Sequence, residues 1–190
     1  MLYFYILPDK NRGILNVVRF AYMDWKKIDE TMSAEEMQEG YMYQNEILYQ
    51  ILDDITRRTG KLTKLFRVVD FKDTRLRNIS ISYFKKEGAA NKMTEDYYPQ
   101  LLDAVVACNC PGSFTSVWNI LRHFFPRRSV EKISIMGKKI KSKDVKFFLK
   151  HVSLENLPVK FGGRGVNWQD VEDLAETVLK MKAAPECDMK

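Results

Sequence analysis

Few residues in this sequence have the type and spacing that catalysis or metal binding requires. The chain of 190 residues has three cysteines and two histidines. Cys108 and Cys110 are one residue apart, which supplies half of a metal site, but zinc takes about four ligands, and His123 and His151 lie in separate segments. The favoured interpretation is that both cysteines are small residues at the end of a strand. We therefore expect no metal.

Motifs for nucleotide binding and nucleophilic catalysis are also missing from the sequence. A dinucleotide site needs a glycine-rich turn between the first strand and its helix, but the segment 21–25 has no glycine. The glycine cluster at 162–165 comes late, after Pro158, so a turn is the favoured interpretation. Neither histidine shares a motif with a serine or cysteine nucleophile. We expect no enzymatic activity and no cofactor.

Positive charge is concentrated in one part of the chain. The formal net charge is +6, and the segment 122–150 carries +8, which leaves −2 for the remainder. A field of this kind attracts a polyanion, either nucleic acid or the anionic face of a membrane. A solvated surface that keeps the protein soluble is the third interpretation.

The apolar pattern along the chain indicates an α/β fold. The length and the 45% hydrophobic content suffice for one soluble domain with its own core. Strands separated by helices require crossover connections and hence a mainly parallel sheet. Ser33 and Glu36 form a predicted capping box, and Pro99 ends the second helix. Strands are predicted at 14–20, 64–71, 101–107 and 132–136, and helices at 33–58, 79–97, 114–125 and 144–151.

The two ends of the chain carry weaker signals. The apolar run 2–7 is either a surface strand or the end of a linker. The residues after Asn167 are predicted to form an amphipathic helix with a polar tail, so we divide the chain into a domain at 1–165 and a C-terminal helix and tail at 166–190. An odd number of cysteines and no export signal favour free thiols in a reducing, cytoplasmic compartment.

Three sequence blocks carry a family resemblance. The first, DYYPQLL, occupies 96–102; the second, CNCPGSF, occupies 108–114; the third, NLPVKFGG, occupies 156–163. With Asp70 at the end of an earlier strand and Lys132 and Ile133 at the start of another, their order and spacing resemble the CRAL-TRIO family from about residue 14 to 165. That family includes fungal phosphatidylinositol/phosphatidylcholine transfer proteins and carriers of tocopherol and retinaldehyde.

The resemblance implies a mixed sheet that forms the floor of a deep apolar pocket, with a lipid inside and a mobile helical gate over it. The gate corresponds to the predicted helix at 114–125. From periodicity alone, ordinary core packing explains its apolar stripe equally well. A helix with an apolar face, followed by cationic residues, is also typical of a segment that docks transiently on an anionic membrane. The gate and pocket residues are Phe114, Val117, Trp118, Leu121, Phe124 and Phe125, and the membrane-facing cations are Arg127, Arg128, Lys138 and Lys139.

The resemblance also implies where a headgroup would bind. Phosphatidylinositol binders of the family carry a Ser or Thr three residues before a Lys, which this chain retains as Ser129 and Lys132. Their Glu-Arg pair after Tyr-Pro is replaced by Gln100 and Leu101, so the carboxylate for inositol hydroxyls is missing. Arg67 stands where choline-lipid binders have a hydroxyl, and it meets either a lipid phosphate or, as an ion pair, Asp70 or Asp73.

These observations predict a non-enzymatic domain that binds and transfers or presents a phospholipid, phosphatidylinositol-like in type. We expect a monomer peripheral to membranes, with no nucleic-acid partner. The small helical module that usually precedes this domain in the family is expected to be absent. Two alternatives remain open: a protein- or membrane-binding scaffold of the same fold without a ligand, and a nucleic-acid-binding module that uses the segment 122–150.

Overall fold

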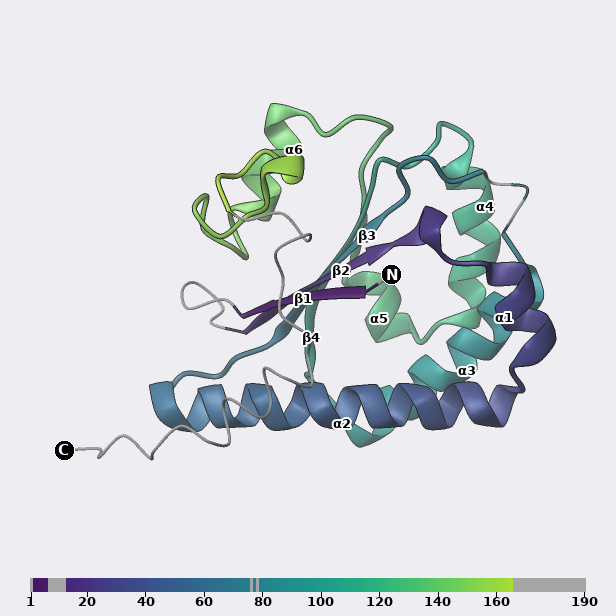
Figure 1. Ribbon diagram of the computed structural model, residues 1–190, viewed down its shortest axis with the longest axis horizontal. Coiled ribbons are helices and arrows are strands. Elements are labelled where there is room, and N and C mark those ends of the chain that lie inside the picture. The colour runs from purple at the N-terminus through teal and green to yellow at the C-terminus, as the bar shows by residue number, and fades with distance from the viewer. Residues whose placement is uncertain (1, 7–12, 76, 78, 166–190) are drawn as a thin grey trace.

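The computed structural model describes residues 2–6, 13–75, 77 and 79–165, and its centre is a mixed sheet of five strands. The strands lie in chain order, β1-β2-β3-β4-β5 (Figure 1). β1 is antiparallel to β2, and the other neighbours are parallel. The predicted α/β class with a mainly parallel sheet is therefore confirmed, and the apolar run at the start of the chain is a strand. The strands are β1 (Leu2–Ile6), β2 (Ile14–Arg19), β3 (Leu65–Asp70), β4 (Leu102–Cys108) and β5 (Ile133–Ile135).

Local signals mark the start of the first long helix between the parallel strands and the end of the second. Ser33 accepts a hydrogen bond from the Glu36 amide, and Glu36 accepts one from the Ser33 amide, which completes the predicted capping box. The second long helix ends at Tyr97, two residues before Pro99. The helices are α1 (Trp25–Thr31), α2 (Ala34–Thr59), α3 (Ile81–Tyr97), α4 (Phe114–Leu121), α5 (Arg127–Glu131) and α6 (Ser142–Phe148), with short 3-10 turns η1 (Phe20–Tyr22), η3 (Arg122–Phe124) and η4 (Val159–Phe161). In the described part of the chain, none of them has the length and apolar character to cross a membrane.

Two helix predictions need correction. The expected continuous helix at 114–125 is α4 followed by η3, and it stops because Phe125 adopts an extended backbone before Pro126. The expected helix at 144–151 begins and ends earlier, as α6. Helix α1 was not predicted; Asp24 caps it by accepting a bond from the Lys27 amide. The predicted C-terminal helix at 166–190 lies outside the described residues.

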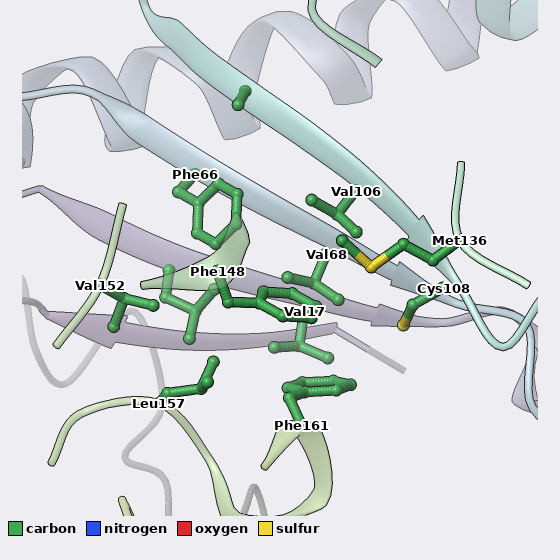
Figure 2. Close-up of a cluster of buried hydrophobic side chains, with 12 residues drawn as sticks. Val17, Phe66, Val68, Val106, Cys108, Met136, Phe148, Val152, Leu157 and Phe161 are labelled. Carbon is green, nitrogen blue, oxygen red and sulfur yellow. The ribbon is translucent and has the colours of Figure 1, made fainter. Parts of the chain in front are cut away.

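One face of the sheet packs into a solid core. Side chains alternate along β3, so Phe66 and Val68 lie on this face with Cys108 of β4. The segment that follows β5 covers them, and Figure 2 shows Phe148 and Phe161 against the strands. These rings and Leu157 are fully buried. This side of the molecule supplies a close-packed interior for the strands.

The opposite face of the sheet carries the helices that precede β5. Figure 1 shows α2, α3 and α4 on the side of the sheet away from α6. An aromatic cluster fills part of the space between them, with Phe20 stacked on Trp25 and Phe71. Phe84 and Phe114 extend the cluster toward α3 and α4. This side, unlike the first, is not completely filled.

Candidate functional site

An apolar cavity of about 210 Å³ lies between the sheet and the helices. Its floor consists of side chains on the face of the sheet opposite the solid core. Val18 and Val69 are register partners on β2 and β3, and Ala107 and Ile133 continue the floor on β4 and β5. Floor and helices thus enclose an apolar space, as the resemblance implied.

Helix α4 and the turn after it form one wall of this cavity. Of the six residues assigned to the gate, Phe114, Trp118, Leu121 and Phe125 line the cavity. The other two, Val117 and Phe124, pack against the surrounding aromatic cluster. The gate residues thus lie together, four in direct contact with the space.

The far end of this wall rests on α3 at a glycine. A Cβ atom built on Gly88 would lie 2.2 Å from the carbonyl oxygen of Phe124, closer than any side chain tolerates. Only glycine at this position lets η3 approach α3 so closely. The contact fixes where the wall meets the body of the domain.

A more polar cavity of about 300 Å³ adjoins the apolar one. The two cavities share five lining residues, among them Arg67 of β3 and Ser129 of α5. Gln100 and Lys132 also line the polar cavity. All four residues assigned to the headgroup therefore border one space, although they come from separate parts of the chain.

All four of these side chains are already bonded within the protein. Lys132 Nζ donates to the carbonyl oxygen of Leu102 at 2.7 Å, and Ser129 Oγ donates to Glu95 Oε2 at 3.3 Å. Gln100 Oε1 accepts from Lys64 Nζ at 3.3 Å. Burial, and then the Lys64 charge, lower the pKa of Lys132. The Lys132 ammonium therefore lies in a partly desolvated position at the cavity wall.

Arg67 occupies the boundary between the two cavities. Its Nε donates to Asn16 Oδ1 at 2.8 Å, which fixes the side chain along the floor of the sheet. Within the described residues Arg67 forms no ion pair with Asp70 or Asp73, so that interpretation is wrong. Asp70 Oδ1 instead accepts bonds from Asn109 Nδ2 and the Lys72 amide. The guanidinium thus faces both the apolar and the polar space.

Comparison with known proteins identifies the family. The model of the CRAL/TRIO domain matches residues 2–163. The chain belongs to the CRAL-TRIO family. A Sec14 cytosolic factor of Schizosaccharomyces pombe is 27% identical over 164 residues, 84% of this chain and 55% of that protein. A CRAL-TRIO domain-containing protein of Saccharomyces cerevisiae is 27% identical over 168 residues, 86% of this chain and 52% of that protein. The chain thus spans about half the length of these relatives.

A solved structure supports the fold. The crystal structure of Sfh5 matches with a TM-score of 0.60 over 99% of this chain and 66% of that one. At 17% identity the match concerns the fold alone. The expected CRAL-TRIO architecture of a mixed sheet beneath covering helices is confirmed.

This CRAL-TRIO domain also places a carboxyl group inside the apolar cavity, a feature that was not predicted from the sequence. Tyr41 of α2 donates its hydroxyl to Glu87 Oε1 of α3 at 2.7 Å, and both line the cavity with Arg67 and Tyr83. Burial, foremost, raises the pKa of Glu87, and burial together with the Glu87 charge raises that of Tyr41. The only available signal was a Glu on the apolar face of a predicted helix.

We expect Glu87→Gln to raise the free energy of unfolding at neutral pH and to leave it unchanged at acidic pH. The folded state holds the Glu87 proton more tightly than the unfolded chain does, so wild-type stability falls as pH rises from the ordinary Glu pKa through the raised one. Glutamine still accepts from Tyr41 but does not titrate. Denaturant unfolding across pH measures the difference, with exposed Glu39→Gln as control. If the free energy of unfolding changes equally in both variants, or in neither, Glu87 does not titrate with a raised pKa in the folded protein.

The four cations assigned to a membrane surface lie at different edges of the sheet. Arg127 forms an exposed ion pair with Glu131, and Arg128 lines the polar cavity at the amino ends of β3 and β4. Lys138 and Lys139 follow β5 and lie at the carboxyl edge. The segment 122–150 therefore does not form one continuous basic strip along the domain.

The cysteines and histidines do not assemble into a reactive site in the described part of the domain. Cys108 and Cys110 are free and buried, and burial raises the pKa of Cys110 to about 12, so its thiol stays protonated. His151 stacks on Phe66 and bonds Asp103 through Nδ1. No group of three potential metal ligands occurs among the described residues. Cys187 lies outside them.

Proposed function

We propose that this chain is a non-enzymatic domain that binds one phospholipid and transfers or presents it between membranes. The observation that carries the proposal is the pair of adjoining cavities: an apolar one for acyl chains, and a polar one that contains the predicted headgroup residues. The CRAL-TRIO family and the similarity to Sec14 cytosolic factors support it. No cofactor and no catalytic group are needed for this activity.

The energetics of transfer explain why a shielded cavity is useful. Each methylene kept from water contributes about 0.8 kcal/mol, so a sixteen-carbon chain that enters water would cost roughly 12 kcal/mol. An apolar lining offsets most of that cost. Since typical ligand cavities measure about 300–1,000 Å³, a space of about 210 Å³ is too small for a two-chain lipid. In our proposal α4 moves outward to admit it.

In our proposal the lipid phosphate binds at the boundary between the cavities. Arg67 lies there with Ser129, and Lys132 and Gln100 line the polar side. A guanidinium, an ammonium and a hydroxyl match the charge and acceptor oxygens of a phosphodiester. We favour a phosphatidylinositol-like lipid on the Ser129 and Lys132 pattern, although Gln100 cannot bind inositol hydroxyls as a carboxylate would.

Docking on a membrane would use the outer surface of the gate. Ile120 is 54% exposed on α4, whereas Trp118 lines the cavity on the same helix. Among the basic residues, Arg127 and Arg128 lie on α5, just after the gate, and would approach anionic headgroups. We propose that a monomer in the cytoplasm contacts the membrane transiently. Lys138 and Lys139 would approach anionic headgroups from the carboxyl edge of the sheet.

Ile120→Asp is expected to reduce partitioning onto vesicles by about tenfold, because a charge replaces an apolar group that enters the interface. Sedimentation with vesicles that contain phosphatidylserine measures it. The control, Leu62→Asp, adds the same charge at an exposed site outside the gate. An equal loss in both variants would exclude α4 as the contact.

Mass spectrometry of an organic extract of the purified protein tests the lipid proposal. A phospholipid present at one molecule per protein supports it. An apo protein that also fails to take up phospholipid from vesicles favours the alternative of a scaffold without a ligand. Salt-dependent binding to nucleic acid with no lipid uptake would favour the remaining alternative.

A further inference from the structure

A second concave site lies at the carboxyl edge of the parallel strands. This cleft measures about 820 Å³ and lies where β2, β3 and β4 end, beside the loop after β5. Within the described ranges it shares only Phe71 with the apolar cavity and no residue with the polar one. In open α/β sheets this edge is the usual place for a ligand.

The cleft is strongly basic. Among the residues that the structure describes, five cationic side chains line it, against the two carboxylates of Asp70 and Asp73. Asp70 is only 4% exposed, and its Oδ1 already accepts two hydrogen bonds. The balance of charge therefore favours an anion with several negative charges. The cations are Arg19, Lys72, Lys138, Lys139 and Lys160.

The loops that carry this charge are held in an unusual geometry. Asp73 and Asn109 both adopt left-handed backbone conformations, with φ of 63° and 53°. Asn109 Nδ2 donates to Asp70 at 2.7 Å, which ties the loop after β4 to the end of β3. The hydroxyl oxygen of Thr74, which also lines the cleft, is buried and has no partner among the described residues. A ligand oxygen would satisfy that donor.

We propose that this cleft binds an anion with several phosphate groups, at a site separate from the lipid cavity. The ammonium groups of Lys72, Lys138 and Lys139 bind its oxygens, and Thr74 donates a hydrogen bond. Pro111 and Gly112 line the same cleft and lead directly into α4, so the bound phosphate lies beside the base of the gate. The anion is either a soluble polyphosphate or the phosphorylated headgroup of a membrane lipid.

Titration calorimetry with sodium tripolyphosphate tests the soluble source. We expect Lys138→Ala/Lys139→Ala to weaken binding by at least about tenfold, because each contact is charge-assisted. The matched control, Lys143→Ala/Lys146→Ala, removes the same charge from exposed positions on α6 that do not line the cleft. Thr74→Val tests the buried hydroxyl with no change in charge.

Vesicle sedimentation tests the membrane source with phosphatidylcholine vesicles that contain phosphatidylinositol bisphosphate, compared with phosphatidylserine at equal total charge. If only the cleft variants lose binding to a probe, the result supports the site, and the probe that is affected identifies the source of the anion. Equal losses in cleft and control variants, or no binding of either probe by the wild type, overturn it. Lipid uptake measured on the same proteins separates this result from failure of the proposed lipid-binding function.

Discussion

Replacing Val18 and Val69 with Phe is expected to reduce phospholipid loading at least about tenfold and to leave the domain folded. The two valines lie side by side on neighbouring strands of the cavity floor and are only half-buried because the cavity lies above them. Two rings would take up much of a space of about 210 Å³. Quantification of co-purified lipid and transfer between labelled vesicles measure the effect.

Stability provides the control for this double variant. The added rings would bury apolar surface that the empty cavity leaves unpacked. Partly filling it should therefore hold or raise the midpoint of thermal unfolding of the lipid-free protein. Leu62→Phe, at a 71% exposed position, should change neither property. Undiminished loading in a folded double variant would show that acyl chains do not occupy this cavity.

Local signals predicted the fold well because they act over a few residues. The capping box of Ser33 and Glu36, and the stop before Pro99, each depend on the nearby backbone alone. The stop after Phe124 was missed because its cause, Pro126, lies just beyond the apolar stripe that made the helix look continuous to Phe125. Helix α1 was missed because its cap, Asp24, lies in a segment read only as a link.

The candidate site was predicted less completely because it depends on how distant elements meet. Family resemblance located Ser129 and Lys132, and the structure places both beside Arg67. The Tyr41 and Glu87 pair is different, since it forms only when α2 packs against α3 in one register. A sequence pattern shows that both residues lie on helices but cannot show that they share a cavity.

The division of the basic segment illustrates the same limit. In the sequence, Arg128 and Lys138 belong to one stretch of positive charge, and a single docking surface is the simplest interpretation. Strand β5 separates them, so one lies by the polar cavity and the other in the carboxyl-edge cleft. Charge summed along a chain therefore does not predict charge summed over a surface.

Arg67→Met should reduce binding of phosphatidylinositol by at least about tenfold and leave diacylglycerol binding unchanged, because only the first ligand carries a phosphate. Lys132→Ala should have a smaller effect, because Lys132 Nζ already donates a hydrogen bond to the Leu102 carbonyl. Binding of fluorescent analogues with matched acyl chains, measured by competition, separates the two lipids. Arg67→Lys keeps the charge but not the planar pair of donors, so it should fall between wild type and Arg67→Met.

The decisive comparison is the ratio of the two lipids within one variant. A structural defect in Arg67→Met, such as the loss of its bond to Asn16, lowers phosphatidylinositol and diacylglycerol binding together. Loss of phosphate recognition lowers the first alone. If both fall in Arg67→Met and Arg67→Lys alike, Arg67 supports the floor of the sheet and the phosphate binds elsewhere. A selective loss places the phosphate at the boundary of the two cavities, with the acyl chains under α4.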